Sequence, residues 1–503
     1  MIEKKIFDAL TEVRDQYVEE ARTTSLKKKQ AFTRKRWTIA AASLFVMLGI
    51  AAMTIRNGFP FGGNAGSGGA GHTEGSIFMS YAGPVFPLTL KASDDDIIAE
   101  RNISYDFSLA TEESLRVWGA SVKDSYILSN SSTSDKKIMA VYPFAGSFME
   151  LGEQLPVVSV DKHQVLPELY AGGYSGGFTG VYGSDNPDGS ENILQLDSWE
   201  GYKSLMEDGN YQNNAFSPYP ELSQQVTVYT FTGFQAPEEY DAATQAISFT
   251  IDPDKTMIMQ YGFNGGEYRE DGFRRFSYFV PRPEQRHRST KLLIVIGDDI
   301  TDYNLEGYKN GACEAGNELE GVSATVTRSV QDLSQVMRQL IGDFFEQYDS
   351  EYVPVVSKDM FLGAVTEFFY QYGLLSESVR DRYQYGMVED IISETNTLDR
   401  VFYLEFPITV PAGGSITITA DMHKEPSYDF YCSGSDNKGI QGYDMVTRLG
   451  SNLLFARLTA ELISTERIEI VRQNFGFDLS QGVTRVELSP GLEHYYLEIR
   501  PLE

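Results

Sequence analysis

Hydrophobic residues follow different patterns along this chain, and the sharpest is an uninterrupted apolar run at residues 38–55, TIAAASLFVMLGIAAMTI. An α-helix of this length spans about 27 Å, close to the ~30 Å hydrocarbon core of a bilayer. Trp37 stands just before the run, where an indole ring favours the membrane interface. The pattern predicts a transmembrane helix over residues 38–55. The alternative is a cleaved signal peptide, because small residues such as Ala51 and Ala52 end the run.

Residues 1–22 show a second pattern, an apolar stripe at helical spacing with acidic residues on the other side. A helix this short cannot bury its stripe alone, because isolated helices of this length are marginal in water. We therefore expect it to bind a partner, to pair with a second copy or to lie on the membrane surface. The predicted partner-binding residues are Ile2, Ile6, Leu10, Val13 and Tyr17.

Beyond the apolar run, runs of β-branched and aromatic residues separated by turn signals predict many short strands, with one stretch of helical spacing between them. We expect an α+β, β-rich fold: an N-terminal transmembrane helix, a β-sandwich-like ectodomain with a helical insertion, and a C-terminal β-sandwich. The predicted segments are a cytoplasmic helix with its basic flank (1–37), the transmembrane helix (38–55), a Gly-rich linker (56–76), a β-rich extracytoplasmic domain (77–328), a helical region (329–397) and a C-terminal β-sandwich-like domain (398–503).

Two local predictions are specific enough to test. Residues 198–209 read as a single helix, with Ser198 as N-cap and Gly209 as its stop signal. The runs FRRFSYFV (273–280) and KLLIVIG (291–297) read as strands, and the loop between them predicts a long β-hairpin.

The distribution of charge predicts which end of the predicted transmembrane helix lies in the cytoplasm. The chain has 503 residues and a net charge of −29, but residues 1–37 hold ten basic against six acidic residues, whereas residues 57–503 hold 31 against 65. The positive-inside rule then places the N-terminus in the cytoplasm and the C-terminal part outside the cell membrane. So acidic an exterior also argues against nucleic acid as a partner, because phosphates require a basic surface.

Candidate chemistry is sparse in the predicted exterior. Acidic clusters at 94–96 and 184–191 leave Ca²⁺ as a conceivable ligand, although neither matches a calcium-loop motif. Asp298 and Asp299 follow an apolar run and are either hydrolase carboxylates or the solvated turn after a strand. The histidines are scattered without zinc-ligand spacing, so no cofactor is predicted. Cys313 and Cys432 are either one disulfide or two free thiols.

A basic island at residues 269–291 stands out against the acidic exterior. Arginines clustered in this way can recognise carboxylate or phosphate groups, so the island is a predicted anion-binding face. The alternative is that its arginines pair with the surrounding excess of acids. The predicted anion-binding residues are Arg274, Arg275, Arg286 and Arg288.

The N-terminal arrangement resembles that of transmembrane anti-sigma factors of Gram-positive, clostridial-type bacteria. The resemblance rests on IFDALTEVRDQYVEEA, the basic run KKKQAFTRKRW, one apolar span and a large exterior part. It implies that residues 1–25 hold a cytoplasmic sigma factor or another regulator while the exterior senses an extracellular ligand. The zinc-binding His and Cys of one anti-sigma class are absent here, which argues against that zinc mechanism. We therefore expect a membrane-anchored binding or sensing protein rather than an enzyme, with a cell-envelope hydrolase or an adhesive surface protein as alternatives.

Overall fold

The computed structural model describes residues 81–502, apart from 109–118, 175–176, 179–192, 195, 197, 241, 283–290, 348–355, 372–373, 377–386 and 431–436. The described part is rich in β-structure, as the alternating pattern predicts, and all of it belongs to one unit, residues 64–503. The predicted membrane span at 38–55 lies outside the described residues. Within them, no helix is long and apolar enough to cross a bilayer.

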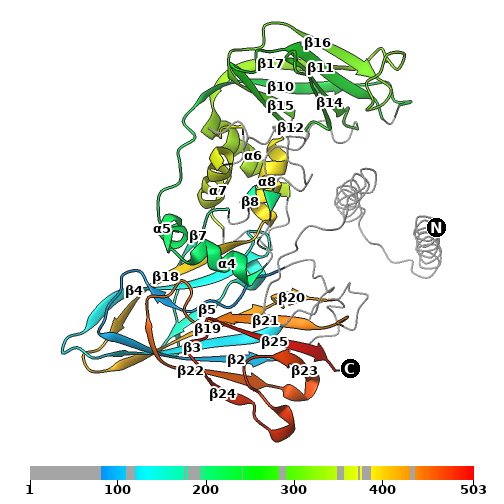
Figure 1. The fold of residues 1–503 in the computed structure, drawn as a ribbon. Helices are drawn as coiled ribbons and strands as arrows, with labels where there is room; N and C mark the ends of the chain where they lie inside the picture. The colour runs from blue at the N-terminus through cyan, green and yellow to red at the C-terminus, as the bar shows by residue number, and fades with distance from the viewer. Residues whose placement is uncertain are drawn as a thin grey trace. The chain divides into compact units, whose positions relative to one another are not determined.

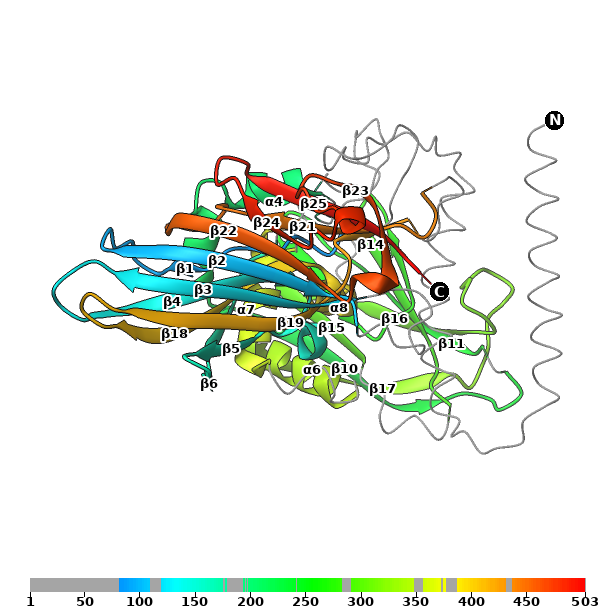
Figure 2. The same ribbon diagram turned by 90° about the horizontal axis from the view of Figure 1, so that it is seen from below.

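The largest sheet joins strands from both ends of the chain. Strands β2 and β22 run parallel although about 350 residues separate them, and the other pairs are antiparallel. Figure 2 shows β22 (orange) beside β2 (blue). The order of the sheet is β24 (Arg485–Leu488), β22 (Leu454–Ile463), β2 (Ile97–Asp106), β3 (Ala120–Asn130), β19 (Ser415–Lys424), β5 (Val157–Val160) and β6 (His163–Gln164).

Two four-stranded sheets share a core with this large sheet. In one of them β4 and β18, from opposite ends of the chain, pair along eleven residues each (Figure 1). The first sheet consists of β1 (Thr89–Leu90), β4 (Lys136–Gly146), β18 (Arg400–Val410) and β7 (Glu168–Ala171). The second consists of β20 (Tyr428–Asp429), β21 (Gln441–Val446), β25 (His494–Pro501) and β23 (Ile468–Gln473).

This pairing corrects the prediction of a separate C-terminal sandwich over 398–503. Strand β18 pairs with β4, and β19 pairs with β3, so strands after residue 398 complete sheets that begin before residue 150. The local sequence pattern predicts that a segment is a strand, but it does not predict which distant strand that segment pairs with.

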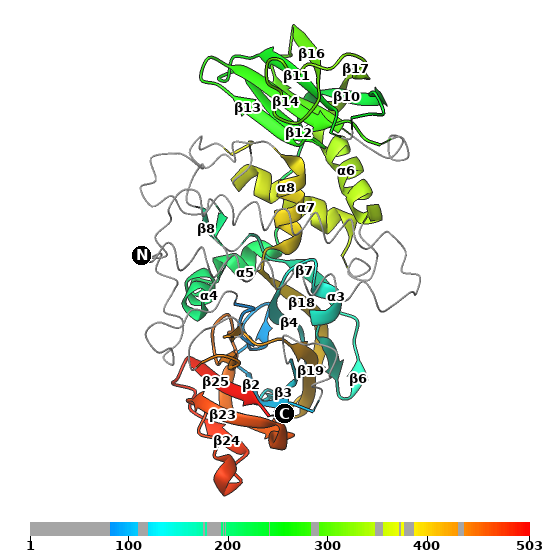
Figure 3. The same ribbon diagram turned by 90° about the vertical axis from the view of Figure 1, so that its right-hand side faces the viewer.

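Residues 225–332 form a two-sheet sandwich with its own aromatic core (Figure 3). The predicted hairpin of residues 273–280 and 291–297 is wrong, because β14 and β15 lie in different sheets. One sheet has β12 (Thr256–Tyr261), β15 (Lys291–Gly297), β10 (Gln225–Gln235) and β17 (Ser323–Asp332). The other has β13 (Gly265–Tyr268), β14 (Phe273–Phe279), β11 (Thr244–Thr250) and β16 (Tyr303–Tyr308).

The helices lie between these strands in sequence. The predicted helix after Ser198 is confirmed, since the Ser198 hydroxyl accepts the Gly201 N–H at 3.3 Å and caps α4. Three longer helices fall within the region predicted to be helical. The elements are α3 (Leu151–Gln154), α4 (Trp199–Met206), α5 (Asn210–Ala215), α6 (Leu333–Gln347), α7 (Lys358–Gln371) and α8 (Val388–Thr397), with a short pair of strands, β8 (Gly177–Phe178) and β9 (Ile193–Leu194).

Helix α8 docks on the sandwich at Gly262, whose N–H and C=O both bond to charged side chains. The Gly262 N–H donates to Glu389 Oε1, and Lys291 Nζ donates to the Gly262 carbonyl at 2.5 Å. Gln260 and Met387 form an isolated bridge beside them. Burial raises the pKa of Glu389 to about 7, and Asp390 adds to this, although Gly262 and Lys291 favour the ionised form.

We expect this junction to weaken as pH rises. A carboxyl whose pKa is raised on folding stabilises the fold at low pH, and that contribution, about 3 kcal/mol here, is lost as pH rises to about 7. Glu389→Gln keeps an acceptor for the Gly262 N–H and cannot ionise. Its thermal midpoint should therefore fall less between pH 5 and pH 8 than that of the wild type. Exposed Glu466→Gln is the matched control and should follow the wild type. Equal pH dependence of Glu389→Gln and wild type would contradict the assignment.

Candidate functional site

An open groove of about 780 Å³ runs beside strand β23. Its size lies within the range of ordinary ligand sites. Apolar side chains form much of its surface, and charged residues stand among them. The described residues that line this β23 groove are Ile468, Glu469, Ile470, Val471, Arg472, Gln473, Phe477, Asp478, Leu479, Ser480, Tyr496 and Leu502.

One wall of the groove is a strand edge that no described strand pairs with. Strand β23 is the last in its sheet and pairs only with β25 among the described strands. Leu502 N–H donates to Arg467 O at 2.8 Å, which makes Ile468 and Pro501 a pair that exchanges no ladder hydrogen bonds. By the same alternation, Ile470 opposite Ile499 exchanges none. The backbone N–H and C=O of Ile470 and the C=O of Ile468 therefore point away from β25, toward the open edge, whereas the Ile468 N–H already donates to the Thr465 carbonyl.

The facing wall is the loop that follows β23, and hydrogen bonds from the Gln473 side chain fix its conformation. The Gln473 carboxamide donates to the Phe477 carbonyl at 2.6 Å and accepts the N–H groups of Gly476 at 3.1 Å and Phe477 at 3.0 Å. Asp478 then caps the short 3₁₀ turn η3 (Leu479–Gln481) by accepting the Gln481 N–H at 3.2 Å. These local bonds fix the loop against the end of β23, and residues 477–480 of the loop line the groove.

A buried carboxylate supports the base of the groove. Glu498 on β25 is fully buried, and burial raises its pKa. Its oxygens accept hydrogen bonds from Tyr428 Oη at 3.0 Å and from Arg472 Nε. Arg472 Nη1 donates in turn to Asn437 Oδ1 at 3.1 Å. The positive charge of Arg472 therefore compensates the negative charge of Glu498. These bonds also hold the Arg472 side chain in the wall of the groove.

The groove presents groups that can contact a ligand. Its described lining offers apolar contact, open backbone groups and charged side chains, and it includes neither His nor Cys. Among these lining residues the Ser480 hydroxyl donates to Asp478 Oδ1 at 2.6 Å, a local bond within the turn that Asp478 caps. The alternating run RIEIVRQ predicts the strand, but the sequence alone did not identify the groove. Whether a strand lies at an edge depends on the partners it finds elsewhere in the chain.

The basic island does not form a single face in the described structure. Arg274 and Arg275 are neighbours on β14, so their side chains point to opposite sides of the sheet. Arg275 pairs with Glu267 at 2.6 Å, whereas Arg274 donates to the carbonyls of Arg269 and Phe273, both at 2.9 Å. Arg286 and Arg288 lie outside the described residues. The two described arginines thus already have partners within the protein.

The acidic residues after β15 are held in a turn. Asp299 Oδ1 accepts hydrogen bonds from Tyr229 Oη at 2.8 Å and from Ile300 N–H at 2.9 Å, and its Oδ2 pairs with Arg328 at 2.7 Å. Asp298 is exposed, and neither residue lines the β23 groove. These contacts match the turn alternative and occupy both oxygens of Asp299.

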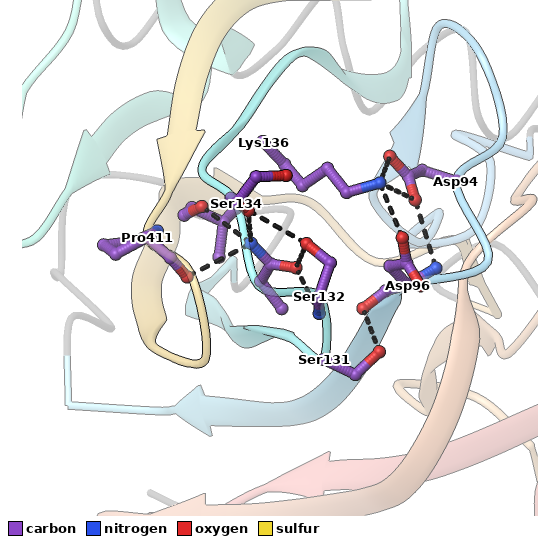
Figure 4. A network of polar contacts seen from close by, with 9 residues as sticks. Asp94, Asp96, Ser131, Ser132, Ser134, Lys136 and Pro411 are labelled. Atoms are coloured by element: carbon purple, nitrogen blue, oxygen red, sulfur yellow. Dashed lines mark hydrogen bonds and ion pairs between the residues drawn. The ribbon is translucent and has the colours of Figure 1, made fainter.

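The acidic cluster at residues 94–96 is engaged by a lysine (Figure 4). Lys136 Nζ lies 3.0 Å from Asp94 Oδ2 and 2.7 Å from Asp96 Oδ2. Its ammonium group thus stands between two of the carboxylates proposed as Ca²⁺ ligands. Among the described residues, no group of three acidic, His or Cys side chains is arranged to hold a metal ion. The second predicted cluster, 184–191, lies outside them.

Most of the remaining predicted residues lie outside the described part of the chain. Ile2, Ile6, Leu10, Val13 and Tyr17 lie in that N-terminal part, and Cys432 also lies outside the described residues. Cys313 is buried as a free thiol.

Neither a protein-family model nor a curated protein matches this chain.

Proposed function

We propose that this chain is a single-pass membrane protein whose exterior part binds a ligand in the β23 groove. The observation that carries the proposal is the groove itself, where apolar side chains meet backbone groups that no described strand pairs. The charge difference across residues 38–55 supports anchoring with the groove outside the cell. The free energy of binding would come from burial of apolar surface and from satisfying the open edge.

Residues 1–25 supply the signalling part of the proposal. Their apolar stripe would face the cytoplasm and bind a sigma factor or another regulator, in keeping with the resemblance to anti-sigma factors. The N-terminal helix would then connect, through the bilayer, to a domain that detects an extracellular ligand.

Variants of the full chain with both Cys313 and Cys432 replaced by serine and one new cysteine introduced test both sidedness and occupancy. On intact cells, a membrane-impermeant maleimide should label Ser480→Cys in the groove and Ser131→Cys, which is exposed elsewhere. Ser25→Cys should react only after permeabilisation. Ser480→Cys should also react more slowly on cells than in the purified chain in nanodiscs, because a ligand covers it, whereas Ser131→Cys should not.

Each arm of this experiment can fail separately. Labelling of Ser25→Cys on intact cells would refute the predicted sidedness. Equal rates for Ser480→Cys on cells and in nanodiscs would refute occupancy of the groove. A peptide of residues 1–25 that retains no sigma factor or other regulator from cytoplasm would refute the signalling role alone.

A further inference from the structure

We propose that the β23 groove receives an extended peptide segment, which adds to β23 as a fifth strand of the sheet. This inference rests on the proposed function and names the class of ligand. An open strand edge offers a row of main-chain donors and acceptors, and strand addition is a recurrent way of binding peptides. The groove runs along this edge, so a peptide lying in it would meet these groups directly.

The register of β23 defines where the added strand would pair. The open groups are the Ile468 C=O and, two residues further on, the N–H and C=O of Ile470, which is the spacing at which one strand face repeats. After Ile470 the pairing with β25 shifts at a bulge. A bulge twists the strand and ends regular pairing, so main-chain recognition would centre on residues 468–470. Strand β23 contains no Lys or Pro, residues that commonly protect exposed edges.

Side chains around the edge select the composition of the peptide. The part-buried side chains of Ile470, Val471 and Leu479 offer apolar surface, and Leu502, which is 44% exposed, extends it. In an extended peptide only alternate residues would reach this surface. The predicted exterior carries a strong acidic excess, which repels acidic ligands and attracts basic ones. The occupant is therefore a neutral or basic segment in which apolar and polar residues alternate.

The test uses the full chain in nanodiscs and a fluorescent library of octapeptides. Each peptide has Lys at both ends and alternates Val, Ile, Leu or Phe with Ser or Thr, and binding is followed by anisotropy. We expect saturable binding. The tightest sequence is then resynthesised with backbone N-methyl groups on either alternate set of residues. Methylation of the set that faces β23 should weaken binding about tenfold or more, because it removes the shared hydrogen bonds, and methylation of the other set should not.

Protein variants provide the matching half of the test. Ile470→Pro removes an outward N–H without removing a ladder bond, so binding should weaken about tenfold. Glu487→Pro is the matched control, because Glu487 also has an outward N–H, on edge strand β24, and does not line the groove. It should bind like the wild type. The thermal midpoint of each variant verifies folding.

The outcomes separate this inference from the proposed function. Absence of saturable binding up to about 1 mM, the limit of weak recognition, would overturn the peptide ligand. Equal binding of the two N-methylated sets would overturn strand addition. In either case slower labelling of Ser480→Cys on cells would still support a ligand in the groove, of another chemical class.

Discussion

Replacing Arg101 with methionine should lower the free energy of unfolding by about 3–5 kcal/mol, because it leaves the buried carboxylate of Asp124 without a counter-charge. Both side chains are fully buried, and the guanidinium binds Asp124 through Nε and Nη2, each at 2.8 Å. Arg101 also donates to the carbonyls of Val446 at 2.7 Å and Phe86 at 3.2 Å. The pair therefore joins the large sheet to β21 and to the segment before β1. Pulse proteolysis of the full chain in urea measures the effect.

The double variant Arg101→Met/Asp124→Leu separates lost charge from lost packing. Removal of both charges leaves no uncompensated carboxylate, so the double variant should be more stable than Arg101→Met alone. It should remain below the wild type, because the hydroxyls of Tyr126 and Tyr142 also donate to Asp124, at 2.6 and 3.2 Å. A double variant no more stable than Arg101→Met alone would contradict this account.

The sequence predicted local structure well where local groups determine it. The α4 cap is an example, since Ser198 and the N–H that it accepts lie three residues apart. The strands themselves were also predictable from β-branched and aromatic residues. Their partners were not: β14 and β15 follow one another in sequence but lie in different sheets, while β2 finds β22 about 350 residues away. Such pairings depend on which faces are buried throughout the protein.

The candidate site could not be predicted from the sequence, because it too depends on pairings between distant segments. Nothing local to Arg472 indicates that its charge neutralises Glu498 on a neighbouring strand, or that no described strand pairs with the opposite edge of β23. The basic island, in contrast, was visible as composition, but strand geometry turns Arg274 and Arg275 to opposite faces. Composition identified unusual residues, and only tertiary pairing determined which of them could act together.

Loss of Arg472 should destabilise the fold by about 3 kcal/mol at pH 8, because it leaves Glu498 buried without its counter-charge. The defect of Arg472→Met should shrink at pH 5. Burial raises the pKa of Glu498 even with Arg472 present, and without that charge the pKa rises further. A raised carboxyl pKa destabilises the fold as pH rises through it, and protonation at low pH removes the penalty. Pulse proteolysis in urea at the two pH values measures both effects.

Two further variants distinguish charge compensation from simple packing in the groove wall. Arg500→Met removes the half-exposed pair with Glu469, which has an N···O distance of 3.3 Å, and should cost no more than about 1 kcal/mol at either pH. Arg472→Met/Glu498→Gln carries no buried charge at this position, and its amide oxygen can still accept the Tyr428 hydroxyl, so it should recover much of the loss at pH 8. A defect in Arg472→Met that stays constant from pH 5 to pH 8 would mean that Arg472 acts by packing alone. A pH-dependent defect would instead show that the wall of the β23 groove is held in place by an internal counter-charge, which leaves the edge backbone, rather than this arginine, to contact the ligand.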